Sequence, residues 1–177
     1  MNKTFAVVAG LVLLGLLLLF SSTFTVKYNE VALLARFGKA SEESVVRDAG
    51  LNFKLPIFDD VSSIDRRIQL VESPAEEITT ADGLQVVVRA FMLWRVDVES
   101  ANGPLDFFNT YETVAGASLP IKGQFRSTFT SALAEYRFDE LIGQGSNLGA
   151  AEDRIRGDLV SILGDNGVEP VVVGISQ

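Results

Sequence analysis

The side chains available for chemistry are few, because the sequence contains no histidine and no cysteine. This excludes Ser-His-Asp triads, cysteine nucleophiles, disulfides and zinc sites built from Cys and His. A Ser/Lys hydrolase would need a lysine of lowered pKa beside a nucleophilic serine, and only Lys54 and Lys122 lie in partly apolar stretches. No serine occupies a G-x-S-x-G or S-x-x-K pattern. We therefore predict no catalytic residues and no enzymatic activity.

Two further patterns could hold a cofactor or a metal ion, and neither has the required spacing. The loop Gly143–Gly149 (GQGSNLG) resembles a nucleotide-binding loop, but it follows a helical turn and has one residue too many before its last glycine. Three acidic pairs lack the spaced oxygen ligands of a calcium loop, and neighbouring residues of a strand point to opposite faces. These pairs are Glu42-Glu43, Asp59-Asp60 and Glu76-Glu77. We predict no cofactor and no metal, and interpret the pairs as solvated loop charges.

The net charge of −8 over 177 residues comes from 15 basic and 23 acidic side chains. Nucleic-acid binding requires a basic face that displaces phosphate counterions, so we predict no nucleic-acid partner. The run Asp65-Arg66-Arg67 and the pair Arg89/Arg95 could bind anions, but charge pairs on strand faces are the favoured interpretation. Trp94 is interpreted as a core or interface residue.

The elements that must position any binding surface begin with an apolar N-terminal segment. Phe5–Phe20 carries no charge and would form a helix of about 24 Å, or about 33 Å with Ser21–Val26 added. We predict a transmembrane anchor over residues 1–26, with Phe5, Val12, Leu16 and Phe20 facing lipid. A cleaved signal peptide is disfavoured, because the apolar run is long and no A-x-A site follows it. The flanking charges leave the orientation open.

Residues 27–177 predict one α+β domain. Its strongest strand is Leu84–Val96, which carries apolar residues on one face and a mixed set on the other. Shorter runs separated by turns predict an antiparallel meander before it. These runs are Tyr28–Phe37, Val45–Arg47, Leu51–Leu55, Ile64–Val71 and Glu77–Thr79.

Helical periodicity replaces the strand pattern after Val96. A first helical stretch begins at Leu105, and an apolar stripe then recurs every fourth residue at Ile121, Phe125, Phe129, Leu133 and Tyr136. Pro120 either lies in a first turn or kinks a longer helix. A further helix is expected over Leu148–Leu163, with Asn147 as its N-cap and Leu148, Ile155, Leu159 and Ile162 as its core face. Val168–Ser176 closes as a strand, so the helices should cover one side of a curved sheet.

The order of these features resembles the stomatin/prohibitin/flotillin/HflK-HflC family, also called SPFH or band 7. The resemblance rests on Y-x-E-x-A-L-x-x-R-F-G-K (28–39), R-D-A-G-L-N-F-K-L-P-I-F-D-D-V (47–61), D-R-R-I-Q (65–69), T-A-D-G-L-x-V (80–86) and L-W-R-V (93–96). It covers roughly residues 26–177 and is most similar to the HflC-type protease modulators. Ala49 stands where many members have proline before the glycine.

The resemblance implies a non-enzymatic membrane scaffold. Family members form large oligomers that enclose a membrane microdomain, and the HflK-HflC branch regulates the AAA+ protease FtsH from the periplasmic face. The expected partners are therefore the lipid bilayer, further copies or an HflK-like paralogue, and an FtsH-type protease. The expected location is a bacterial-type inner membrane with the soluble domain outside the cytoplasm. Family members continue into a coiled coil, whereas this sequence ends at Gln177 without heptads, so it is either truncated or a short form.

Two points stay open at the level of sequence. Phe53, Leu55, Ile57 and Phe58 are a candidate loop that contacts the membrane or a neighbouring subunit, with plain core packing as an equal alternative. The alternative function is a monomeric, membrane-tethered binding module for an extracytoplasmic ligand, which a concave pocket and a stable monomer would favour.

Overall fold

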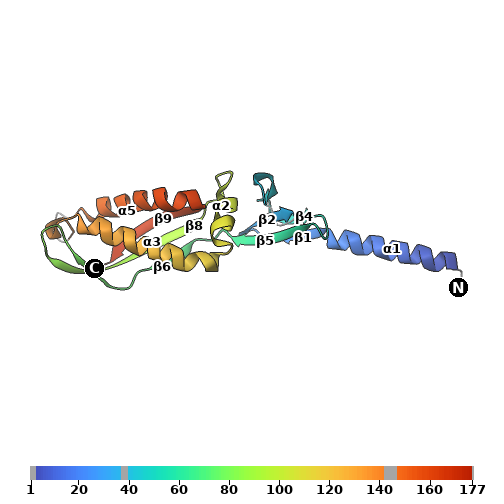
Figure 1. Ribbon diagram of the computed structural model, residues 1–177, viewed down its shortest axis with the longest axis horizontal. Coiled ribbons are helices and arrows are strands. Elements are labelled where there is room, and N and C mark those ends of the chain that lie inside the picture. Colours follow the sequence, from blue (N-terminus) through green and yellow to red (C-terminus); the bar gives the residue numbers. More distant parts are fainter. Residues whose placement is uncertain (1–2, 37–39, 142–146, 177) are drawn as a thin grey trace. The chain divides into compact units, whose positions relative to one another are not determined.

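The computed structural model describes residues 3–36, 40–141 and 147–176 of the chain. These residues form two compact units, Met1–Ile64 and Asp65–Gln177. The first unit begins with helix α1 (Lys3–Ser21), which is labelled in Figure 1. Its large apolar side chains are exposed, from 47% at Leu18 to 84% at Phe20. In the part of the chain that is described, no helix combines the length and the apolar character needed to cross a membrane.

The α1 helix is followed by a strand and not by the helical extension considered from the sequence. Strand β1 (Thr23–Val26) pairs antiparallel with β4 (Gly50–Phe53), with Thr23 opposite Phe53 and Val26 opposite Gly50. Thr23, Thr25 and Val26 are β-branched, which favours a pleated conformation once a partner strand is present. The anchor prediction therefore extended the helix too far.

A second small sheet completes the first unit. Its central strand β2 (Glu30–Arg36) lies between β3 (Val45–Val46), which follows the 3₁₀ turn Glu42–Ser44, and β5 (Asp59–Asp65). Its buried apolar residues are Val31, Ala32, Leu33, Ala35 and Ile64. Strand β5 was not predicted, because the two aspartates at its start suggested a loop.

The second unit is organised around one long strand. Strand β8 (Gln85–Val96) pairs antiparallel with three strands: β6 (Gln69–Glu72), β7 (Glu76–Thr79) and β9 (Val168–Ser176). Its alternation is confirmed, since every even-numbered residue from Val86 to Val96 is buried. The predicted strand Ile64–Val71 was wrong, because β5 ends at Asp65 and β6 starts only at Gln69.

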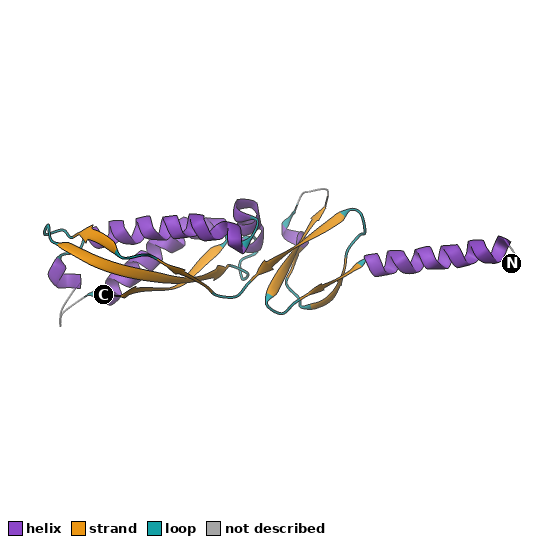
Figure 2. Cartoon of the chain, turned by 90° about the horizontal axis from the view of Figure 1, so that it is seen from below, coloured by secondary structure: helices purple, strands orange, loops and turns teal. Residues whose placement is uncertain are grey.

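Helices cover one face of this sheet, as Figure 2 shows. They are α2 (Gly103–Tyr111), α3 (Val114–Ala134), α4 (Phe138–Leu141) and α5 (Leu148–Leu163), and the 3₁₀ turn η2 (Gly164–Asn166) leads into β9. The α+β prediction is confirmed. Pro120 lies inside α3, so the longer-helix alternative is the correct one.

The helix cores follow the predicted stripes with three exceptions. In α3, Ile121, Phe125, Phe129 and Leu133 are fully buried, whereas Tyr136 lies beyond the end of the helix. In α5, the buried residues are Ala151, Ile155, Leu159 and Leu163. The predicted core residue Ile162 is 40% exposed and Leu148 is only partly buried. The spacing of four from Ile155 and Leu159 continues to Leu163, and this leaves Ile162 on the flank.

Candidate interaction surface

The connection between β4 and β5 presents apolar side chains to solvent. Phe53, Leu55, Ile57 and Phe58 are 73%, 51%, 93% and 48% exposed. The core-packing alternative considered from the sequence is therefore not what the structure shows. Large apolar side chains gathered on a surface commonly mark a contact with protein or lipid. We refer to Phe53–Phe58 as the apolar loop.

The base of the apolar loop is held by a buried carboxylate. Asp59 is only 6% exposed, and its oxygens accept hydrogen bonds from the Arg36 guanidinium at 2.8 Å and from the Leu55 backbone N–H at 2.9 Å. The Asp59 N–H in turn donates to the Leu55 carbonyl at 3.1 Å. Asp59 was predicted to be a solvated loop charge, and that was wrong. The sequence could not pair it with Arg36, which lies 23 positions away on β2.

We call the hydrogen bonds of Asp59 to Arg36 and Leu55 the clamp. The clamp orients the side chains of the apolar loop outward. Since Asp59 ties Leu55 back to the strand, the residues between them must turn sharply, and Ile57 adopts a positive φ of 78°. A β-branched residue in this region is strained, so the surrounding bonds must hold it there. The outcome is an isoleucine at the tip of the turn with almost its whole side chain in solvent.

The ionisation of Asp59 is favoured by these partners. The Arg36 side chain, and after it the Leu55 N–H, hold the pKa of the Asp59 carboxyl below its ordinary value. A carboxyl whose pKa is lowered by folding stabilises the folded state above its unfolded pKa, and this contribution is lost as the pH falls through the folded pKa.

We therefore expect Asp59→Asn to destabilise the first unit at pH 7. The difference in unfolding free energy between variant and parent should shrink as the pH is lowered below about 4, the ordinary range of an aspartate. Urea unfolding at a series of pH values, followed by circular dichroism, measures this. Asp60→Asn is the matched control, because Asp60 is exposed. Equal effects of the two substitutions would contradict the clamp.

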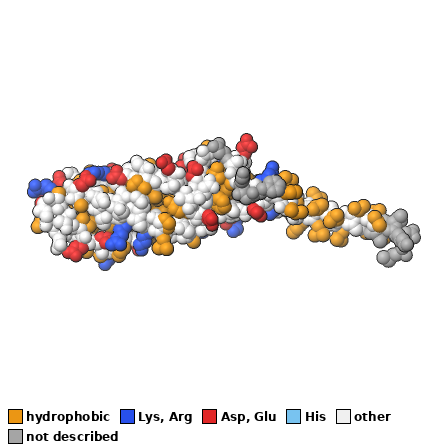
Figure 3. Space-filling model, viewed as in Figure 1, with side chains coloured by type: hydrophobic (Ala, Val, Ile, Leu, Met, Phe, Trp, Pro, Cys, Tyr) orange, Lys and Arg blue, Asp and Glu red, His pale blue; other side chains and the backbone are white. Residues whose placement is uncertain are grey.

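The apolar loop is joined directly to the end of α1. The Lys54 N–H donates to the Ser22 carbonyl at 2.8 Å, and Phe53 is the strand partner of Thr23. Leu51 lies on the same face of β4 as Phe53 and is 66% exposed. Leu51 was not among the predicted contact residues, although its i,i+2 spacing from Phe53 in a strand was the available signal. Exposed apolar side chains thus continue from α1, where Figure 3 shows them, into β4 and the loop.

The two units differ in charge. Residues 1–64 contain six basic and six acidic side chains, whereas residues 65–177 contain nine basic and seventeen acidic ones. The whole net charge of −8 therefore belongs to the second unit. An anionic membrane surface repels such a unit and does not repel the neutral first unit.

Other residues considered from the sequence have structural roles. Arg95 pairs with Glu169 across β8 and β9 at 2.7 Å, which confirms a charge pair on a strand face. Glu76 accepts a hydrogen bond from Arg126 at 2.7 Å. Trp94 is a core residue, 1% exposed, with its ring tilted against that of Phe107 at 6.2 Å between centroids.

The positions considered for chemistry are not brought together. Lys122 is exposed on α3. Most of the glycine loop, residues 143–146, lies outside the described residues. Within the described ranges, no three acidic side chains gather into a possible metal site.

Comparison with known families agrees with this architecture. The family model described as "SPFH domain / Band 7 family" matches residues 24–177, which is most of the chain. The chain belongs to the SPFH/band 7 family. This confirms the resemblance read from the strand and turn motifs, and the SPFH match begins at Phe24, within β1 and beyond α1.

Curated relatives of this SPFH protein include HflC proteins. It is 29% identical over 135 residues to "Protein HflC" of Buchnera aphidicola subsp. Schizaphis graminum, covering 71% of this chain and 42% of that protein. It is 28% identical over 116 residues to "Modulator of FtsH protease HflC" of Escherichia coli K12, covering 63% of this chain and 32% of that protein. The matched regions thus span about a third to two fifths of these relatives.

Proposed function

We propose that this protein is a non-enzymatic, membrane-anchored SPFH subunit that modulates a membrane protease of the FtsH type. The single observation that carries the proposal is the family match over residues 24–177, together with relatives named as HflC and as a modulator of FtsH protease. The absence of histidine and cysteine supports a regulatory and not a catalytic role, since the commonest catalytic groups are missing.

The first part of the proposal is attachment to a bilayer through α1 (Lys3–Ser21), the helical part of the predicted anchor. The apolar side chains of α1 are exposed to solvent, among them those of Phe5, Val12, Leu16 and Phe20. Water around a helix that is apolar on all sides is unfavourable, and a lipid phase removes that cost. The proposed location is the inner membrane of a bacterial-type cell, with the second unit outside the cytoplasm.

The second part assigns the apolar loop to the membrane surface beside the anchor. The hydrogen bond from Lys54 to Ser22 holds the apolar loop next to the junction between α1 and β1. The first unit also carries no net charge. Both features favour contact with the lipid interface. A neighbouring subunit is the other partner that this loop fits.

A single labelled cysteine distinguishes lipid from protein at the loop. Because the parent has no cysteine, Ile57→Cys provides the only thiol, and its 93% exposed position should tolerate the change. We expect an NBD label there to fluoresce more strongly in lipid nanodiscs than in buffer, and to be quenched by brominated acyl chains. Leu119→Cys on α3, 80% exposed, is the control that should not respond. Quenching equal at both sites, or absent at Ile57, would contradict lipid contact by the loop.

The third part is assembly with further copies or with an HflK-like paralogue into a large scaffold. The test is the mass of the natively expressed protein after extraction in a mild detergent. A megadalton-scale particle that retains an FtsH-type protease supports the proposal. A monomer that leaves degradation of FtsH substrates unchanged contradicts it.

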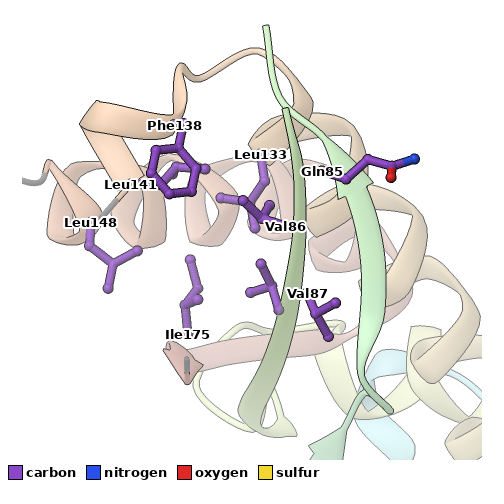
Figure 4. A pocket seen from close by; sticks show the side chains of 9 residues that line it. Gln85, Val86, Val87, Leu133, Phe138, Leu141, Leu148 and Ile175 are labelled. Atoms are coloured by element: carbon purple, nitrogen blue, oxygen red, sulfur yellow. The ribbon is translucent and has the colours of Figure 1, made fainter. Parts of the chain in front are cut away.

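The second candidate function is a monomeric membrane-tethered binding module. The observation in its favour is an apolar cavity of about 250 Å³ in the second unit, which Figure 4 shows. A stable monomer that binds a ligand in this cavity would place this alternative ahead.

A further inference from the structure

Strands β6 and β7 together form one edge of the sheet in the second unit. Both pair antiparallel with β8 and, among the described residues, with no other strand. The register changes by one residue between them, since Glu72 lies opposite Phe91 whereas Glu76 lies opposite Val88. A β-bulge at residues 73–75 therefore divides a single edge strand into two straight stretches. We refer to residues 69–79 as the β6–β7 edge.

The backbone groups of the β6–β7 edge point alternately toward β8 and away from it. The Ser73 N–H donates to the Ala90 carbonyl at 2.9 Å, and the Thr80 N–H donates to the Leu84 carbonyl at 2.8 Å. In each stretch, the residues that alternate with these bonded positions direct their N–H and carbonyl groups away from β8. They are Leu70, Glu72, Glu77 and Thr79. Within the described ranges nothing bonds to these backbone groups, so they are available to an added strand.

The β6–β7 edge is open to solvent, unlike the edge formed by β9. All four of its outward-directed residues are exposed, with Leu70 at 56%. On β9, the outward Ile175 N–H already donates to Glu152 at 2.8 Å, and Pro170 has no N–H to offer. The residues of the β6–β7 edge are all described and lie far from both ends of the chain. This edge is therefore the one that can accept a further strand.

The β6–β7 edge is acidic. Glu72 and Glu77 flank the bulge, and their side chains lie on the face of the sheet away from the helices, since the residues next to them are buried under the helices. Neither carboxylate forms an ion pair in the part of the chain that is described. Arg89 of β8 lies opposite the bulge, and the edge itself contains no lysine or arginine.

An apolar row crosses the same face of the sheet and ends at this edge. Leu70 lies opposite Leu93, which in turn lies opposite Val172. Leu70 and Val172 are 56% and 42% exposed. An added strand places one more residue in line with this row. An apolar residue there would bury part of the Leu70 side chain, which is favourable.

Charge distinguishes a second copy of this chain from a different protein as the occupant. If two copies paired antiparallel about the middle of the edge, Glu72 of each copy would lie opposite Glu77 of the other. Like charges directly opposite each other destabilise a pair of strands. Lysine or arginine at these positions forms favourable cross-strand pairs instead. The net charge of −8 on the second unit also attracts a basic segment.

We propose that the β6–β7 edge binds an extended basic segment of a partner protein by strand addition. The segment runs antiparallel to the edge, as β8 does on the other side. The proposal does not rest on the proposed protease role, because the edge and its charges belong to the second unit alone.

Strand β8 gives the spacing that the segment needs. On β8, the residues opposite Thr79, Glu77, Glu72 and Leu70 are Gln85, Val87, Phe91 and Leu93. Counted from the residue opposite Thr79, the segment therefore has basic residues at positions 3 and 7 and an apolar residue at position 9. The N–H groups at these odd positions point to the edge, whereas those at even positions point away from it.

Binding of a designed peptide to the full chain tests the backbone contacts. The probe is fluorescein-labelled Thr-Thr-Lys-Thr-Thr-Thr-Lys-Thr-Leu, measured by polarisation against the protein in phosphatidylcholine nanodiscs, with empty nanodiscs as the blank. N-methylation of both lysines should weaken binding at least about tenfold, because two hydrogen bonds to the edge are lost. N-methylation of the threonines at positions 2 and 8 should change it by less than about threefold. Equal effects of the two modifications, or no saturable binding, would overturn the proposal.

Reversing the charge of the edge tests the side-chain contacts. Glu72→Lys combined with Glu77→Lys should weaken binding of the lysine peptide at least about tenfold. The same variant should bind a peptide with glutamate at positions 3 and 7, which the parent does not.

Asp153→Lys combined with Asp158→Lys on α5 is the matched control. It makes the same change in net charge at exposed positions of a helix that packs on β9. This control should keep the preference of the parent for the lysine peptide. A control that reverses the preference as the edge variant does would show general attraction by charge only, and the proposal fails. If the edge variant instead lowers the mass of the assembly and no peptide binds, a second copy occupies the edge and the proposal also fails.

Discussion

Replacing Val12 and Leu16 with arginine is expected to release the protein from the membrane. Both positions lie in the middle of the apolar segment and are exposed on α1, at 58% and 61%. An arginine at the centre of an inserted helix costs about 2.5 to 3.5 kcal/mol on insertion scales, so the pair costs about 5 to 7 kcal/mol. A free-energy cost of this size opposes insertion of the helix. The protein should therefore move from the membrane to the soluble fraction.

Flotation of cell membranes after a carbonate wash measures this release. The control carries the same two charges elsewhere, as Leu119→Arg and Val160→Arg on α3 and α5, where the side chains are 80% and 44% exposed. The control should float with the membranes as the parent does. A Val12→Arg, Leu16→Arg protein that also floats would show that residues 1–26 are not the anchor.

Truncation of Phe129 to alanine is expected to cause a large loss of stability in the second unit. Its side chain is fully buried on α3, with its ring 5.3 Å from that of Phe125 between centroids. Removing a buried phenylalanine ring typically costs about 3 to 5 kcal/mol, from lost transfer free energy and from the cavity that remains. This is a large part of the stability of an ordinary domain.

Urea unfolding in detergent, followed by the fluorescence of Trp94, measures the change. Trp94 is the only tryptophan and is buried in the same unit, so its emission reports on this core. Leu119→Ala on the same helix should change the unfolding free energy by less than about 0.5 kcal/mol, because Leu119 is 80% exposed. Similar losses for both substitutions would show that α3 does not pack as described.

The regular elements were predictable where one periodicity extended over many residues. The alternation of β8 places Met92 and Trp94 on one buried face, and the four-residue spacing of Phe125 and Phe129 places both in the core of α3. In each case the side chains themselves define the buried face, so local sequence was sufficient. The bounds of α5, Leu148–Leu163, agree as well, although its buried face was predicted only in part.

Short elements were predicted less well. Strand β1 was assigned to the anchor and β5 was missed, since runs of four and seven residues carry little periodic signal. Their conformation depends on partners far along the chain, such as Gly50–Phe53 for β1. Ile162 and Leu163 are both apolar, and only the direction from which β9 and α3 cover α5 decides which of them is buried.

For the candidate surface, the residues were predictable from the sequence, but their exposure was not. The sequence selected Phe53, Leu55, Ile57 and Phe58 as a group, but apolar composition alone could not distinguish a core segment from an exposed one. The decision depends on Asp59, whose bonds to Arg36 and Leu55 turn the chain and leave Ile57 outside. In the sequence, the position of Asp59 next to Asp60 gave no indication that Asp59 would form these hydrogen bonds.

By itself, the sequence determined the absence of histidine and cysteine chemistry, the apolar N-terminal segment, the α+β order of elements and the family. These follow from composition and from patterns within short windows of chain. Only the tertiary structure decided that the apolar loop is exposed and that Asp59 is a buried clamp. Each of these depends on contacts between distant residues, and a one-dimensional pattern does not contain such contacts.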